Sequence, residues 1–213
     1  METMDLINML ARWGHLLFGM TWIGLLYYFN FIQGGYFKGA SPEALKDAKA
    51  KLAPEALWWF RWGAMFTFLT GLFLLMGVAK LQVMNDYIVL GATLGTLMFM
   101  NVWMIIWPKQ KIALGLVEGD AAAAAPKALL ASRTNVLFSG PMAFCMLAGP
   151  HFGGLGGGYT GVGSTALWVA LAIVGALFIN GLKGKQGPMT TVRGVIVSSL
   201  VLTLVLIGIL KVL

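Results

Sequence analysis

The sequence has 213 residues, of which 59% are hydrophobic and 11% are charged. Soluble domains carry about 25% charged residues, so this composition excludes an ordinary soluble globular protein. The net charge is +7, but the basic residues are spread over three short loops, which argues against a nucleic-acid-binding surface. The apolar runs are long and continuous, which favours helices over a β-barrel. We therefore expect an all-α integral membrane protein with one transmembrane domain over residues 1–213.

Six apolar runs are long enough to cross a bilayer. They predict a bundle of about six transmembrane helices, at residues 6–32, 57–78, 87–107, 134–149, 165–182 and 192–212. The fourth run is the shortest, and Pro141 is expected to kink it. Glu2 and Asp5 make the N-terminus acidic, and no small-residue cleavage site follows the first run. We therefore expect the first helix to be retained rather than removed as a signal peptide.

The basic residues predict the orientation of the bundle. Twelve of the fifteen lysines and arginines lie at residues 38–61, 109–133 and 183–193, in or beside alternate loops. The other three are Arg12, Lys80 and Lys211, near the opposite side. By the positive-inside rule, the three basic loops are cytoplasmic and both termini lie on the outer side.

Three connecting segments have a distinctive composition. Ser41 and Pro42 are an N-cap and first-turn pair, which predicts a short surface helix over residues 41–52. Five alanines at 121–125 predict a helical spacer that Pro126 ends. The glycine-rich residues 153–163 lack the lysine and the strand–helix context of a phosphate-binding loop, so they predict flexibility or a close backbone approach.

His15 is the first candidate site residue, because an ionisable side chain inside a membrane-length apolar run marks a functional site by default. Gly19 follows one helical turn later and would let a flat macrocycle lie against the helix. Arg12 could extend outward to a haem propionate or a lipid phosphate. The alternative is structural: His15 donates a hydrogen bond between helices, and Gly19 is a close-packing position.

His151 is the second of the two histidines and follows Gly149 and Pro150 at the outer end of the fourth span. In the predicted topology it lies on the same side as His15. Two histidines at similar depth on different helices could supply both axial ligands of a b-type haem. The alternative is a solvated loop histidine.

Other motifs limit the chemistry further. Gly91 and Gly95 form a GxxxG pattern, which is typical of a helix-packing face or an oligomer contact. The single cysteine, Cys145, allows no disulfide, and no CxxCH motif for covalent haem attachment is present. No paired carboxylates occur inside the apolar runs, which argues against a proton-driven transporter or pump, and few polar groups could line the path of a channel.

A family resemblance is carried by residues 91–111. The run GATLGTLM, with Asn101 and Val102 and the run IIWPKQK, is similar to the GAMLGT…NV…IPNQ segment of the urate-oxidase N-terminal family. This family is the membrane domain of the bacterial membrane-bound urate oxidase (urate hydroxylase). Residues 12–24, 59–71 and 133–151 resemble other parts of it, so the resemblance covers most of residues 8–152.

The resemblance implies a multi-span bundle in the bacterial inner membrane and an oxidoreductase context, with electrons passed to a cytochrome c; the termini on the outer side would then be periplasmic. It also implies histidines that this sequence lacks: one position is Val89, and another, in the loop after the first span, has no counterpart near Gly34. The histidine near the end of the fourth span is retained as His151. The family's cytochrome c domain has no counterpart here, since there is no CxxCH motif.

We therefore predict an electron-transfer or oxidoreductase subunit that holds haem b through His15 and His151, with Arg12 at a propionate. Its partner would be a periplasmic cytochrome c. No catalytic set is visible, which leaves open whether the chain is an enzyme. The alternative is a cofactor-free accessory subunit of a larger membrane complex. In that case both histidines are packing residues, and the GxxxG and glycine-loop surfaces bind partner chains.

Overall fold

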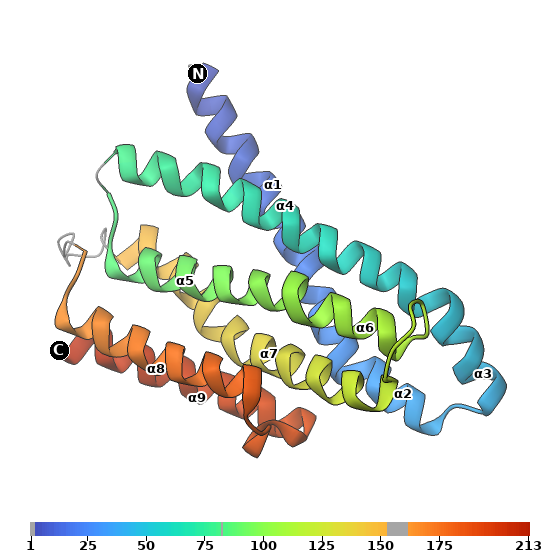
Figure 1. Ribbon diagram of the computed structural model, residues 1–213. Helices are drawn as coiled ribbons and strands as arrows, with labels where there is room; N and C mark the ends of the chain where they lie inside the picture. The colour runs from blue at the N-terminus through green and yellow to red at the C-terminus, as the bar shows by residue number, and fades with distance from the viewer. Residues whose placement is uncertain (1–2, 82, 153–161) are drawn as a thin grey trace. The chain divides into compact units, whose positions relative to one another are not determined.

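The computed structural model describes residues 3–81, 83–152 and 162–213, and all regular secondary structure in these ranges is helical (Figure 1). The long helices are α1 (Thr3–Tyr27), α4 (Ala53–Lys80), α5 (Asp86–Met100), α7 (Ala121–Phe152), α8 (Thr165–Lys183) and α9 (Val192–Val212). The short helices are α2 (Gly34–Gly39), α3 (Pro42–Asp47), α6 (Trp107–Ala113) and the 3₁₀ turn η4 (Gly187–Thr190). Three π-helical segments lie between them: η1 (Tyr28–Gln33), η2 (Ala48–Leu52) and η3 (Asn101–Ile106).

Each of the six predicted spans lies inside a helical segment, and five of these segments are long and apolar enough to cross a membrane. The five are Thr3–Gly39, Pro42–Lys80, Asp86–Ala113, Thr165–Lys183 and Val192–Val212. The described part of the chain is thus all-helical and contains five candidate membrane spans. The periplasmic position of the termini stays a prediction.

Helix α7 contains the remaining predicted span, residues 134–149, but is not among the five. Its composition is too polar because it includes Arg133, Thr134 and Asn135. All three are buried, as are all ten residues from 130 to 139. A helix that other helices shield from lipid can carry polar side chains, which explains why hydropathy alone does not mark it.

The chain divides into two compact units, Met1–Gly71 with Phe99–Arg133, and Leu72–Met98 with Thr134–Leu213. Helices α4, α5 and α7 each contribute to both units. The prediction of one domain over residues 1–213 stays a prediction.

In the first unit, α1 runs antiparallel to the first part of α4. The ring of Phe18 lies 5.1 Å from that of Phe66, and the ring of Phe29 lies 5.4 Å from that of Phe60. Gly63 makes the close approach possible, because a Cβ atom there would lie 3.2 Å from the backbone nitrogen of Trp22. Beyond the far end of α1, Asn30 donates a 2.7 Å hydrogen bond to Ser132.

In the second unit, α5 packs along α7. A Cβ atom at Gly91 would lie 3.0 Å from the Cβ atom of Cys145, and Gly95 faces Met142. The GxxxG pattern therefore packs against a helix of the same chain, while an oligomer contact through it stays a prediction. Helices α8 and α9 run side by side (Figure 1).

Of two predictions about the ends of helices, one is confirmed and the other is wrong. The backbone nitrogen of Ala44 donates to the Ser41 hydroxyl, so α3 has the predicted N-cap, and η2 continues the surface helix to Leu52. The prediction that Pro126 ends the alanine spacer is wrong. Helix α7 starts at Ala121 and continues through Pro126 to Phe152.

Two further expectations concern the ends of spans. The third predicted span, residues 87–107, lies inside a longer helical path, because α6 continues it to Ala113. The predicted glycine-rich loop lies mostly outside the described residues, at 153–161.

Candidate functional site

His15 lies on the side of α1 that faces α4, and its ring is held by two groups of α4. The ring atom Nδ1 is 2.9 Å from the backbone carbonyl oxygen of Thr67 and 3.2 Å from the hydroxyl oxygen of Thr70. Both contacts lie within the first unit. Thus the first predicted site residue makes specific contacts instead of facing lipid.

These contacts fix the protonation of the ring. A carbonyl oxygen can only accept a hydrogen bond, so Nδ1 of His15 must carry the hydrogen and donate it. The Thr70 hydroxyl is 2.6 Å from the carbonyl oxygen of Phe66 and donates to it, which leaves the Thr70 oxygen to accept from Nδ1. In the neutral imidazole the other nitrogen, Nε2, then carries a lone pair. Among the described residues, no hydrogen bond reaches Nε2.

Gly71 is the third member of the His15 site. A Cβ atom at this position would lie 3.0 Å from Cε1 and 3.4 Å from Nδ1 of His15. Such a contact is tighter than most real Cβ contacts, so any larger residue would displace the ring. Thr67, Thr70 and Gly71 occupy one face of α4 because they are three and four residues apart. Together they orient the imidazole.

Gly19 and Arg12 flank His15 on α1. A Cβ atom at Gly19 would be 3.8 Å from Cγ2 of Thr67, an ordinary contact, so Gly19 faces α4. Arg12 is exposed, as is 59% of the neighbouring Trp13 surface. Whether either residue touches a cofactor stays a prediction.

His151 lies in the last turn of α7, in the second unit, rather than in a loop. Its side chain is exposed, while the next residue, Phe152, packs against Tyr87 with ring centres 5.6 Å apart. The amino group of Lys211 lies 4.9 Å from the centre of the Phe152 ring. Helix packing thus anchors the turn that carries His151 and leaves the histidine accessible. Ligation by this histidine stays a prediction.

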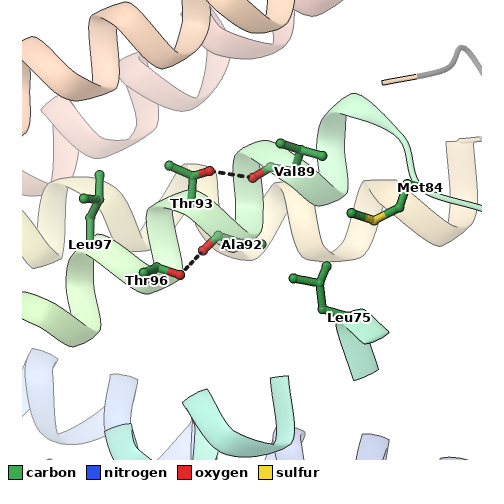
Figure 2. Close-up of a pocket in the computed structure, with 7 residues that line it drawn as sticks. All are labelled: Leu75, Met84, Val89, Ala92, Thr93, Thr96 and Leu97. Atoms are coloured by element: carbon green, nitrogen blue, oxygen red, sulfur yellow. Dashed lines mark hydrogen bonds between the residues drawn. The ribbon is translucent and has the colours of Figure 1, made fainter. Parts of the chain in front are cut away.

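An apolar pocket of about 300 Å³ lies in the second unit. It is lined by Leu75, Met84, Val89, Ala92, Thr93, Thr96 and Leu97 (Figure 2). Both threonine hydroxyls donate to carbonyl oxygens of their own helix, so neither hydroxyl hydrogen is available to the pocket. Val89, where the family resemblance implies a histidine, faces this pocket. The wall therefore suits hydrocarbon rather than a metal or an anion.

The described part of the chain offers few ligands for a metal site other than a haem iron. No group of three or more histidine, cysteine or acidic side chains there could hold a metal ion. The thiol of Cys145 is buried against α5. A haem iron differs from such centres, since one or two protein ligands are sufficient for it.

Comparison with protein families shows to which family the chain belongs. The model of the urate oxidase N-terminal family matches residues 80–207. The chain belongs to the urate oxidase N-terminal family. No curated protein and no solved structure matches it.

The family match covers α5, α7 and α8 and most of α9, and it includes the GATLGT segment and His151. The resemblance to this family is confirmed. The matched range begins after residues 8–79, on which part of the resemblance was based, so it does not include His15, Thr67 or Thr70. The role of His15 therefore rests on its own geometry.

The sequence did not reveal the partners of His15 as such. Thr67 and Gly71 occur in one of the resembling stretches, but nothing in that stretch pairs them with a histidine more than 50 residues earlier. The only signal was the spacing of small and polar residues at 67, 70 and 71 on an otherwise apolar helix.

Proposed function

We propose that this member of the urate oxidase N-terminal family is an electron-transfer subunit of the bacterial inner membrane that binds haem b. His15 supplies one axial ligand and His151 the other, and a periplasmic cytochrome c is the electron partner. Family membership and the five candidate membrane spans are the basis of this proposal. The haem, its two ligands and the electron partner are what the proposal adds.

The observation that supports it best is the hydrogen bond from Nδ1 of His15 to the carbonyl oxygen of Thr67. Histidines that bind a metal almost always donate their second ring N–H to a carbonyl or carboxylate, which fixes the tautomer and the ring orientation. His15 has this arrangement, and its Nε2 has no competing partner within the described chain. The donor chemistry of His15 therefore fits a haem iron.

The other residues would have supporting tasks. Exposed Trp13 and Leu16 give the helix an apolar surface beside His15, and the positive charge of Arg12 suits a propionate. A bound haem would supply reversible one-electron storage. Thr67 and Thr70 would keep the Nδ1 proton in place, and Gly71 would leave room for the ring.

The hydrogen bond from His15 to Thr67 is also compatible with the alternative, an accessory subunit without a cofactor. His15 donates from α1 to α4, as a histidine with a purely structural role would. The two proposals differ in what occupies Nε2, and therefore in the visible spectrum of the protein.

The test is the absorption spectrum of the full chain, purified in mild detergent from cells supplied with a haem precursor. The proposal expects a Soret band, with α and β bands that sharpen when dithionite is added. A colourless protein with full helical circular dichroism would leave the accessory role.

Single variants then test the ligands. His15→Ala is expected to lose the haem, while His151→Ala is expected to keep it with one ligand changed. If His15→Ala retains the wild-type spectrum, the assignment of His15 is wrong even though haem is bound. His15→Gln, which keeps a hydrogen-bond donor for Thr67, controls for loss of packing between α1 and α4.

A further inference from the structure

A second site in the first unit is independent of the histidines and centres on Trp107. The guanidinium carbon of Arg61, on α4, lies 3.9 Å from the centre of the Trp107 ring. The amino group of Lys111, one turn further along α6, lies 5.3 Å from the centre of the same ring. Two positive charges from different helices therefore meet at one indole.

This arrangement brings like charges together without an acidic partner. In the described part of the chain the observed ion pair joins Lys51 to Asp47, and no carboxylate pairs with Arg61 or Lys111. Because both cations contact one ring, their separation is no more than about one Debye length, roughly 8–10 Å. Arg61 is also partly buried. A partly desolvated cation beside a like charge is costly unless an anion accompanies it.

The neighbouring side chains indicate the depth of this site in the membrane. Trp58 and Trp59 lie three and two residues before Arg61, at the start of the predicted span 57–78, and are 44% and 53% exposed. Exposed tryptophans beside basic residues at the end of a membrane helix are typical of the lipid headgroup region. The anion that reaches Arg61 and Lys111 is then expected to come from a lipid.

We propose that Arg61, Lys111 and Trp107 form a binding site for the phosphate of an anionic phospholipid. The planar guanidinium can donate two parallel hydrogen bonds to phosphate oxygens, and the ammonium adds a second charge. Trp107 holds both cations in place through its ring face. A zwitterionic lipid also has a phosphate, but its own cation would compete with Arg61 and Lys111.

The proposal is tested by titrating the full chain in neutral detergent with phosphatidylglycerol and counting bound lipids by native mass spectrometry. Phosphatidylcholine and inorganic phosphate are titrated separately. A basic side chain near a membrane surface changes affinity for anionic lipid about fivefold. The variant Arg61→Gln/Lys111→Gln is therefore expected to bind phosphatidylglycerol about 25-fold more weakly than the wild type.

The matched control is Lys183→Gln/Lys185→Gln, which removes the same charge at the end of α8. It is expected to change the affinity less than threefold. Equal losses in the two double variants, or equal binding of phosphatidylcholine and phosphatidylglycerol, would overturn the proposal. Inorganic phosphate that binds as tightly as the lipid would also overturn it, since the site would then hold a free anion.

Arg61→Lys keeps the charge and serves if the double variant does not fold. It replaces a planar fork by a single ammonium group, so the affinity for phosphatidylglycerol should fall about two- to fivefold. Unchanged affinity in Arg61→Lys would contradict a specific phosphate contact.

Discussion

Gly71→Ala tests most sharply how α4 positions His15. The new Cβ atom would lie 3.0 Å from Cε1 of the imidazole, whereas ordinary contacts start at 3.4 Å. The ring must therefore move by several tenths of an ångström. Nδ1 is already 2.9 Å from the Thr67 carbonyl oxygen and 3.2 Å from the Thr70 oxygen, so such a shift weakens one or both hydrogen bonds.

The expected energies nearly cancel, and this makes a control essential. Replacing glycine by alanine inside a helix stabilises it by about 1 kcal/mol, and a hydrogen bond of this kind contributes about 0.5–1.5 kcal/mol. Gly71→Ala should thus change the free energy of unfolding by less than about 1 kcal/mol. The control is Gly24→Ala on α1, where a Cβ atom would meet nothing within 4 Å. It should gain the full stabilisation, about 1 kcal/mol.

The assay combines denaturant unfolding in detergent with nitrogen-15 spectra of histidine-labelled protein. The chain has two histidines, so His151→Ala assigns the signals of His15 directly. In the wild type, His15 should show a protonated Nδ1 and an unprotonated Nε2, and Gly71→Ala should shift both signals. If Gly71→Ala is as stabilising as Gly24→Ala and leaves the His15 signals unchanged, the contact between Gly71 and the ring does not exist.

The remaining predictions concern other described contacts. Thr70→Val should keep the fold and shift the Nδ1 signal of His15, because it removes only the acceptor at 3.2 Å; Thr93→Val, whose hydroxyl bonds within its own helix, should not shift it. Gly181→Ala should destabilise the protein by about 1–3 kcal/mol, because its Cβ atom would lie 2.5 Å from the Thr134 hydroxyl. Gly175→Ala, on the same helix with nothing within 4 Å, is its control in an unfolding titration. Asp86→Asn should cost about 1–3 kcal/mol, because the buried carboxylate accepts from Ser164 and from the backbone of Gly163. Wild-type stability in Asp86→Asn would show that these contacts contribute nothing.

Features set by nearby residues could be predicted from the sequence. The six long helices follow from continuous apolar runs, and the start of α3 follows from Ser41 and Pro42. A bilayer-length helix forms its backbone hydrogen bonds within itself, so its position needs no knowledge of the rest of the fold. Local sequence patterns could not show that residues 130–139 of α7 are buried, because burial depends on neighbours distant in sequence.

The candidate site was predictable only in part, for the same reason. His15 is conspicuous as an ionisable residue in an apolar run, but its partners lie 52 and 55 residues away on α4. Gly19 was chosen from spacing along one helix, which could not show that it faces Thr67 on α4; its contact with a cofactor stays a prediction. The two cations at Trp107 meet only because α4 and α6 pack together. The basic residues of the sequence indicated topology, and not this cluster.

The most direct test of the account is the low-temperature electron paramagnetic resonance spectrum of the oxidised, purified chain. Ligation by His15 and His151 predicts a low-spin ferric signal typical of two imidazole ligands, which becomes high-spin in His151→Ala and disappears in His15→Ala. The absence of a haem signal from protein expressed with a haem precursor, or a low-spin signal unchanged in His15→Ala, would contradict the account.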